Sequence, residues 1–453
     1  MFQTFKNAWK VQDLKKKILF TLMILLLYRI GASLCVPYVN INAFDAQASL
    51  LNNSQGLFAM FGLLSGEAFS KATLFALSVS PYITASIVMQ LLTIAIPALE
   101  KLSKEGEEGK KKITAYTRWV TVALALVTAY GYVMLLDSYG ALTITKTDKA
   151  QYWFGVAVMV ACFCAGAAII MWLAEQINDH GIGNGISMIL FANIISSFAS
   201  MVAQMRAMVQ DTIVVGGNYV YTWKQGWALA GGIIGIVVSI LLTLAAILLI
   251  VWFTNSERRI PIQYAKRVVG RKMYGGQASN LPLKMNMAGV MPVIFASSIV
   301  SIPATIAGFI PNTGYAKWVE KWFNYNTIPY ILVFIVLIFL FSYFYIMISF
   351  NPVEVANNIR SNGGAVPGIR PGKPTSDYIK KILNRITLMG AVFLVIIAGV
   401  PLIAGVVTTA LNFPFTSLAF LGTSLLIVVG VALETVRDLE AQLAMRNYKG
   451  FLD

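Results

Sequence analysis

The sequence contains few charged residues. Only 12% of its 453 residues are Asp, Glu, Lys or Arg, whereas 57% are hydrophobic. A soluble domain has roughly 25% charged residues. A soluble protein of this length could not cover its surface with so few charged side chains, and it would aggregate. We therefore expect a membrane protein that is mainly helical within the lipid.

Histidine and cysteine are also scarce. The one histidine, His180, excludes a metal site built from several histidines. Three cysteines cannot form a disulfide framework, and Cys162 and Cys164 lie together in one apolar run. The glycine-rich run at 181–185 would need a preceding strand to hold a phosphate, but it joins two apolar segments, which predicts a tight turn. With no catalytic motif in the sequence, we expect no enzyme activity, no metal and no cofactor.

The apolar residues form ten long runs. Each run is long enough, as a helix, to cross about 30 Å of hydrocarbon. Basic residues precede the first run, but its apolar core is too long for a signal peptide and no small-residue cleavage site follows. The predicted transmembrane helices cover residues 18–36, 72–96, 116–137, 152–173, 183–206, 227–254, 286–309, 328–350, 384–406 and 411–436.

Basic residues are distributed unevenly among the loops. Of the 35 Lys and Arg residues, 27 lie at the termini or in the loops that share their side of the membrane, and only six lie in or beside the opposite loops. Lysine and arginine accumulate on the cytoplasmic side of membrane proteins. We therefore predict that both termini are cytoplasmic.

Ten spans divide into two sets of five. Because five is odd, the second set is inverted relative to the first, as in many transport proteins. Residues 81–86 in span two and 292–297 in span seven share the pattern P-x-I-x-A-S, which by itself is weak support. Arg29 lies within the first span, and no chain of carboxylates follows it through the other spans, which disfavours an ion-coupled transporter.

Several segments outside the spans complete the predicted organisation. The apolar part of residues 56–71 is too short to span the membrane, and it predicts either a part of a transport pathway or a helix at the outer interface. The basic loops 255–285 and 351–383 suit anionic lipid, nucleic acid or a solvated surface. The predicted divisions are an amphipathic helix at 1–17, a first half at 18–206, an external loop at 207–226, a second half at 227–436 and a tail at 437–453.

Several stretches, in order along the chain and with no span added or missing, together resemble one family. The sequence is similar to the SecY family, the channel-forming subunit of the bacterial Sec protein translocon. The stretches that carry the resemblance are FALSVSPYITASIVMQLL (75–92), KEGEEGKKKITAYTR (104–118), MWLAEQINDHGIGNGISMI (171–189), ERRIPIQYAKR (257–267), LPLKMNMAGVMPVIFASSI (281–299), NP followed by VPGIRPG (351–372), and GTSLLIVV (422–429).

The resemblance implies an all-α polytopic membrane protein with ten transmembrane helices, in two inverted five-helix halves that form a clamshell around an hourglass pore. In the family, spans two and seven face each other across a lateral gate. At the matching positions the gate residues are Ser86, Ile87, Gln90, Asn286, Ser297 and Ser298. The family's plug corresponds to residues 57–71, and its candidate residues are Leu57, Phe58, Phe61, Gly62, Leu64, Gly66 and Glu67.

The resemblance also implies a ring of aliphatic side chains at the waist of the pore. A hydrophobic constriction seals by dewetting and can still deform around an extended chain. The ring residues are Val79, Ile83, Ile186, Leu190, Ile294 and Ile427. Val79 and Leu190 replace the isoleucine that is common in the family, but both are aliphatic, so the seal is expected to be retained.

Partners follow from the resemblance as well. The basic loops are implied to bind ribosomal RNA phosphates at the tunnel exit or the SecA ATPase, since the planar guanidinium binds oxyanions in pairs of hydrogen bonds. Their candidate residues are Arg258, Arg259, Lys266, Arg267, Arg271, Lys272 and Arg370. SecE and SecG are the implied subunits, and signal sequences, nascent polypeptides and membrane lipids are the other implied contacts.

The implied function is translocation of unfolded secretory polypeptides across the bacterial plasma membrane, with lateral release of transmembrane segments into the lipid. The alternative from another class is an inverted-repeat secondary transporter for a small solute.

Overall fold

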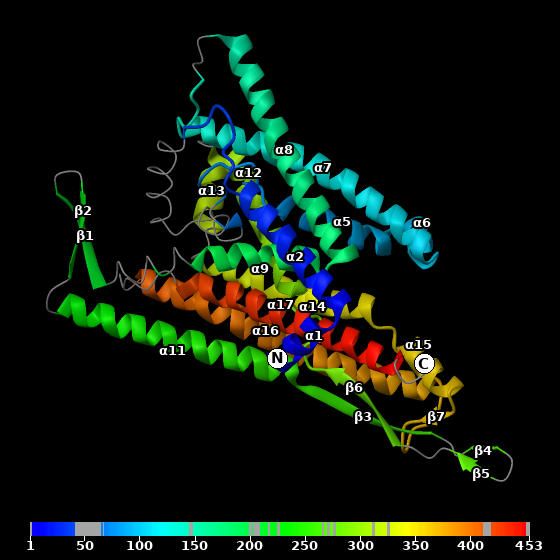
Figure 1. Cartoon of the computed structure of the whole chain (residues 1–453). Helices are drawn as coiled ribbons and strands as arrows, with labels where there is room; N and C mark the ends of the chain where they lie inside the picture. Colours follow the sequence, from blue (N-terminus) through cyan, green and yellow to red (C-terminus); the bar gives the residue numbers. More distant parts are fainter. Residues whose placement is uncertain are drawn as a thin grey trace.

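The structure is a computed structural model. It describes residues 2–40, 65–66, 68–144, 148–198, 202, 209–215, 218–223, 227–264, 267–269, 272–274, 278–309, 313–323, 327–410 and 418–449. Helices dominate the described chain, as the long apolar runs predict (Figure 1). Each of the ten predicted spans contains a helix, although several helices begin or end away from the predicted boundaries.

The first half starts with two helices in direct succession, α1 (Phe2–Lys10) and α2 (Gln12–Gly31). Helix α5 begins at residue 80 and not at 72, because Pro81 occupies the first turn, where its missing N–H is not needed. Residues 72–79, which the sequence assigned to this span, form turns, apart from a β-bridge between Thr73 and Cys35. The other helices of this half are α5 (Ser80–Ala95), α6 (Pro97–Lys104), α7 (Glu107–Ser138), α8 (Lys149–His180) and α9 (Gly185–Ser196).

The described residues of the second half form five long helices and two short ones. They are α11 (Trp227–Asn255), α12 (Met291–Phe309), α13 (Gly314–Trp322), α14 (Ile328–Ser349), α15 (Pro352–Ser361), α16 (Lys373–Ala410) and α17 (Leu418–Lys449). Helix α16 begins well before the predicted boundary at 384, so part of the predicted loop 351–383 belongs to it.

Among the described residues, five helices are long and apolar enough to cross a membrane, and the count is six if α5 and α6, which meet at a bend of 101°, are taken as one span. The other helices assigned to spans are shorter, as α9 is, or more highly charged, as α2 is with its four basic residues. The chain is a multi-pass membrane protein in which helices of unequal length pack together.

The two halves repeat one packing pattern. In the first half α2 contacts α9, α5 contacts α7, α7 contacts α8, and α8 contacts α9. The corresponding helices of the second half make the same pairs, which are α11 with α17, α12 with α14, α14 with α16, and α16 with α17. Between the halves α5 packs on α12 and α9 packs on α17, so these two helices meet their own counterparts, as helices near a two-fold axis do. The packing therefore agrees with the inverted five-helix halves.

Short sheets extend from both ends of the helical body (Figure 1). At one end β1 (Gln210–Val215) and β2 (Asn218–Trp223) form a hairpin. At the other end β3 (Glu257–Tyr264) pairs with β6 (Ala278–Lys284) on one side and with β7 (Gly364–Ala365) on the other, while β4 (Arg267–Val269) pairs with β5 (Lys272–Tyr274). No strand was predicted in these loops.

Both termini lie at the end that carries β3 and β6. Thr4 Oγ1 in α1 donates a hydrogen bond of 3.0 Å to Glu440 Oε1 in α17, and the side chains of Ala8, Leu14 and Leu439 pack together beside Ile182. This packing agrees with the predicted placement of the two termini on one side of the membrane.

Candidate channel waist, gate and basic platform

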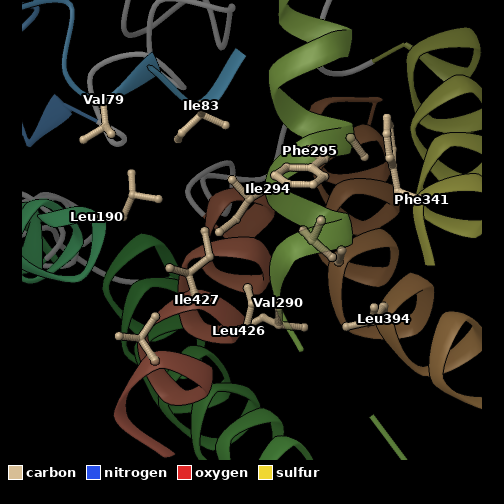
Figure 2. Close-up of a cluster of buried hydrophobic side chains, with 14 of the residues drawn as sticks. Val79, Ile83, Leu190, Val290, Ile294, Phe295, Phe341, Leu394, Leu426 and Ile427 are labelled. Atoms are coloured by element: carbon tan, nitrogen blue, oxygen red, sulfur yellow. The ribbon is translucent and has the colours of Figure 1, made fainter. Parts of the chain in front are cut away.

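The six predicted ring residues come together from both halves of the molecule. Val79 precedes the first turn of α5, and Ile83 follows one turn later. The other four lie on α9, α12 and α17. Five of the six side chains are no more than 6% exposed and belong to one hydrophobic cluster, against which the partly buried Ile186 packs. Figure 2 shows Val79, Ile83, Leu190, Ile294 and Ile427 directed toward one another.

Local sequence signals place these side chains. Pro81 starts α5 just after Val79. The side chain of Asn184 caps α9, because its Oδ1 accepts hydrogen bonds from the backbone N–H groups of Ile186 at 3.1 Å and Ser187 at 3.4 Å. Gly185 begins α9 where an added Cβ would collide with the backbone carbonyl of Ala174 in α8. The predicted tight turn at 181–185 is therefore present, and it sets where α9 begins.

The predicted gate helices α5 and α12 are in contact, and α12 also packs on α7. Ile87 is buried in the same cluster as the ring. The polar gate candidates mostly bond within their own helices: Gln90 Nε2 donates to Ser86 Oγ at 3.5 Å, and the hydroxyls of Ser297 and Ser298 both donate to the carbonyl of Ile294.

Asn286 differs from the other gate candidates in position. It lies before the start of α12, is 8% exposed, and lines a cavity at the end of the molecule that carries β6. A role for this side chain in the gate therefore stays a prediction.

The plug candidates Leu57, Phe58, Phe61, Gly62, Leu64 and Glu67 lie outside the described residues. Gly66 is described, and it has a φ of +63°, a conformation that glycine adopts easily. A Cβ at this position would lie 3.1 Å from Arg29 Nη1 and 3.1 Å from the carbonyl oxygen of Asn193. The end of the predicted plug segment therefore rests between α2 and α9.

The two basic loops meet in one sheet. Strand β3, from the first loop, pairs with β7 from the second through Gln263 with Ala365 and Tyr264 with Gly364. We call β3, β6, β7 and residues 366–372 the basic platform. Ile260 and Ile262 of β3 are buried against α15 and α16, which fixes the platform on the helical body.

The platform exposes three of the predicted binding arginines, Arg258, Arg259 and Arg370. Arg259 Nη2 also forms an ion pair of 2.6 Å with Glu257. Thr375 Oγ1 donates a hydrogen bond of 2.8 Å to the carbonyl of Arg370, which holds the backbone of that loop. Arg267 and Lys272 are described through their backbones in β4 and β5, whereas Lys266 and Arg271 lie outside the described residues.

A cavity of about 500 Å³ lies between the platform and the ring, and its charged residues were not among the predicted site residues. Its lining includes Asn184, Asn286, Lys284, Glu434, Arg437 and Asp438. Burial lowers the pKa of Lys284, and the positive charge of Arg437 lowers it further. Glu434 lies in the predicted tenth span, whereas Arg437 and Asp438 lie in the predicted tail, and no sequence pattern indicated that these three side chains line one cavity.

Charged side chains of α17 connect separate parts of the structure at this cavity. Arg437 Nη2 donates hydrogen bonds to the carbonyl of Thr254 at 2.7 Å and to Asn255 Oδ1 at 2.8 Å, at the end of α11. Asp438 Oδ2 accepts a hydrogen bond of 3.2 Å from the backbone N–H of Gly183, in the other half. Direct hydrogen bonds therefore join the two halves at this end.

Arg118 in α7 and Glu175 in α8 form the other notable pair. Arg118 Nε bonds to Glu175 Oε1 and Nη2 to Oε2, both at 2.9 Å. Such a two-bond pair fixes the relative position of the two helices. Glu175, whose side chain is 11% exposed, thus helps to hold α8 against α7.

Comparison with known proteins agrees with this arrangement. A family model described as SecY matches residues 73–436 of the chain. The chain belongs to the SecY family. The protein translocase subunit SecY of Streptomyces coelicolor is 45% identical over 460 residues, and the alignment covers 100% of both chains. The SecY of Mycobacterium tuberculosis is 41% identical over 469 residues, again with 100% coverage of both.

Solved structures share the SecY fold with this chain. One described as the structure of a protein conducting channel matches with a TM-score of 0.60 at 19% identity, covering 94% of this chain and 92% of that one. Family membership and fold both favour a channel, and neither supports the solute-transporter alternative.

Proposed function

We infer that this chain is the channel-forming subunit of a protein translocase. The observation that carries this inference is the meeting of six aliphatic side chains from four helices of both halves, inside a chain of the SecY family. Such a constriction excludes ions by dewetting when closed and yields to an extended polypeptide, since aliphatic contacts have no fixed direction. The channel performs no catalysis, so the driving energy comes from a partner.

The distribution of basic residues gives the orientation of the protein in the membrane. The platform, both termini and most of the Lys and Arg residues lie at one end, and the positive-inside rule assigns that end to the cytoplasm. The proposed location is the bacterial plasma membrane. SecE and SecG are the proposed subunits, and the proposed substrates are signal sequences, unfolded secretory chains and transmembrane segments.

The basic platform is the proposed binding surface for the ribosome and for the SecA ATPase. Arg258, Arg259 and Arg370 support this role, because they are exposed on a sheet and a loop that are anchored to the helical body. Arginine binds both phosphate and carboxylate through two parallel hydrogen bonds, so one surface suits both partners.

The contact between α5 and α12 is the proposed lateral gate, and residues 57–71 are the proposed plug. The gate proposal rests on two helices, one from each half, that pack beside the ring and bond their polar groups mainly within themselves. Helices joined by few polar bonds across their interface separate at low cost in free energy.

The direct test is cross-linking from the ring to a polypeptide in transit. A photo-reactive amino acid at position 83, 186 or 294 should cross-link to a secretory chain that is stalled during translocation, and only while the chain is present. A probe at Leu248, which is 70% exposed on α11, is the matched control and should label lipid instead. The absence of cross-links from all three ring positions would overturn the proposed pore lining.

A further inference from the structure

Helix α13 connects two helices of the second half at the end of the molecule away from the basic platform (Figure 1). It follows α12 after residues 310–313 and leads into α14 after residues 323–327. Helix α12 has 19 residues, which makes it about 28 Å long, close to the roughly 30 Å thickness of the hydrocarbon. A helix joined this closely to the outer ends of α12 and α14 therefore lies near the surface of the membrane.

The side chains of α13 divide into an aromatic face and a basic face. One face carries residues with the spacing i, i+3, i+4 and i+7, and these are Tyr315, Trp318, Val319 and Trp322. Val319 is buried, whereas the three aromatic side chains are 38%, 51% and 45% exposed. Lys317 and Lys321, one turn apart, are exposed on the opposite side of the helix. The aromatic side chains thus extend outward beside the position where Val319 is buried.

Hydrogen bonds attach α13 to both neighbouring helices. The Tyr315 hydroxyl donates a hydrogen bond of 3.3 Å to the carbonyl of Pro303 in α12. Thr327 Oγ1, at the start of α14, donates one of 3.0 Å to the carbonyl of Trp322. The rings of Tyr315 and Trp318 also stack, with centroids 6.3 Å apart. A contact that holds α13 therefore also holds the outer end of α12, which is the second-half helix of the proposed gate.

The surface beside α13 is apolar and faces lipid. Ile302 and Ile306 near the end of α12 and Ile328 at the start of α14 are all exposed. Exposed aliphatic side chains on membrane-crossing helices contact lipid. Tryptophan and tyrosine gather where lipid meets water, because an apolar ring that carries one polar group suits both surroundings. The lipid interface thus continues from these isoleucines onto the aromatic face of α13.

The two lysines of α13 fit the same surface. Only six of the 35 basic residues lie in or beside the outer loops, and two of the six are Lys317 and Lys321. A helix that lies in the membrane interface carries basic residues on the face away from the hydrocarbon. From that face, the ammonium groups can reach the negatively charged phosphates of the lipid headgroups.

We propose that α13 binds the phospholipid interface of the outer leaflet and so anchors the outer end of the gate helix α12. The aromatic face enters the region of the glycerol backbone, and Lys317 and Lys321 bind headgroup phosphates. The proposal rests on the proposed orientation, which assigns this end to the outer leaflet, and on the proposed gate. Interfacial aromatic and basic residues set the depth and tilt of the helices to which they are joined. The anchor thereby keeps α12 at a constant depth while α5 of the other half moves away from it.

Depth-dependent fluorescence quenching tests the contact with lipid. An aromatic fluorescent amino acid is placed at position 318 or 317 of the purified full-length complex, in vesicles of phosphatidylglycerol and phosphatidylethanolamine. Quenching by nitroxide lipids labelled near the glycerol should be stronger at 318 than at 317, and quenching by aqueous iodide should show the reverse order. Position 317 is the matched control, because it lies on the opposite face of the same helix.

Two results of this measurement would overturn the proposal. Quenching at 318 by iodide and not by the nitroxide lipids would place the aromatic face in water. Protection of 318 from both quenchers would place this face against a protein and not against lipid.

A second measurement tests the anchoring of α12. With the fluorescent amino acid at position 306, the double variant Trp318→Ala, Trp322→Ala should shift the measured depth toward the bilayer centre. The reason is that the end of a short apolar helix then loses the groups that hold it at the surface. Trp153→Ala is the matched control, since Trp153 is exposed near the start of α8, a helix of the first half.

An unchanged depth at 306 in the double variant would overturn the anchoring of α12. An equal shift in Trp153→Ala would show that the loss of any interfacial tryptophan moves α12, which overturns the specific role of α13. Cross-linking from the ring to a stalled chain does not involve α13. The channel function and the lipid anchor can therefore fail independently of each other.

Discussion

The waist and the basic platform lie near the same helix, α17, but their side chains have opposite chemistry. Ile427 on this helix faces an aliphatic cluster, whereas Asp438, roughly 16 Å further along the helix, bonds to the other half. At the waist the contacts are apolar and have no fixed direction, except for the hydrogen bond of 3.2 Å from Asn193 Nδ2 to Ser78 Oγ. At the platform end, strand pairing and the hydrogen bonds of Arg437 and Asp438 add directed contacts to the apolar packing that anchors the sheet.

The difference between the contacts at the waist and those at the platform explains how one chain combines a deformable seal with a rigid docking surface. A seal that admits many polypeptides needs contacts that re-form at many spacings, and dispersion forces between aliphatic groups do this. A docking surface must present its charges at constant spacing, and strand pairing with directed hydrogen bonds does that.

The largest effect is expected from a substitution in the ring at the waist. Ile83→Gly should raise ion leak through closed channels on the order of tenfold or more, as expected if about 1.4 kcal/mol is removed from the barrier. The measurement is the rate of ion leak from proteoliposomes that contain the variant complex. Ile170→Gly is the matched control, since Ile170 is buried in the same cluster on α8 but is not in the ring. Equal leaks in both variants would mean that loss of packing, and not loss of the ring, opens the channel.

The next largest effect is expected from a substitution in the basic platform, which should impair partner binding while the waist stays closed. Arg370→Glu should weaken coupling to the ATPase partner and protein export about tenfold, since it places a negative charge where an anionic surface binds. Assembly and ion tightness should not change. Export in inverted membrane vesicles measures the effect, and Arg360→Glu, an exposed arginine on nearby α15, is the charge-matched control. Normal export by the Arg370 variant would remove this residue from the proposed binding surface.

A smaller effect tests the rigidity of the platform end. Asp438→Asn should destabilise the complex by roughly 1–2 kcal/mol, because a charged acceptor for the Gly183 N–H becomes a neutral one. The measurement is the thermal unfolding midpoint in detergent. Asp377→Asn on the exposed surface of α16 should leave the midpoint in place. An unchanged midpoint for both variants would show that this end does not depend on the bond between the halves.

The smallest effect concerns the exposed pair of Arg259 with Glu257. Glu257→Gln should change stability by less than about 1 kcal/mol, since exposed ion pairs contribute little. The same change frees Arg259 for an anionic partner, so ribosome binding should become slightly tighter in a salt-dependent way. Binding measured at two salt concentrations tests this, and weaker binding would mean that Glu257 positions the arginine.

The features that the sequence predicted correctly depend on local composition. Each apolar run contains a helix because a chain in lipid must satisfy its backbone hydrogen bonds internally. The turn at 181–185 was also predictable, since closely spaced glycines permit the tight approach of α9 to α8. The family could be recognised from stretches such as 75–92 and 171–189, and that resemblance implies the six ring positions.

Other features depend on partners distant in the sequence. The pairing of Gln263 with Ala365 joins two loops whose own residues carry no strong strand signal. Helix α5 begins at Ser80 because turns occupy 68–79, and hydropathy does not distinguish an apolar turn from an apolar helix. The cavity beside Lys284 and the bond from Asn193 to Ser78 arise only when α9 and α17 meet the other segments.

The sequence by itself determined that this protein is a helical membrane protein and how its positive charge is divided, because hydrophobicity and charge act through each residue's own transfer between water and lipid. The tertiary structure alone decided how the side chains pack at the waist, how two loops form one platform and where Ser78 is held. Those features depend on distances and directions between segments, which a hydrogen bond or a packed ring requires and which composition does not specify.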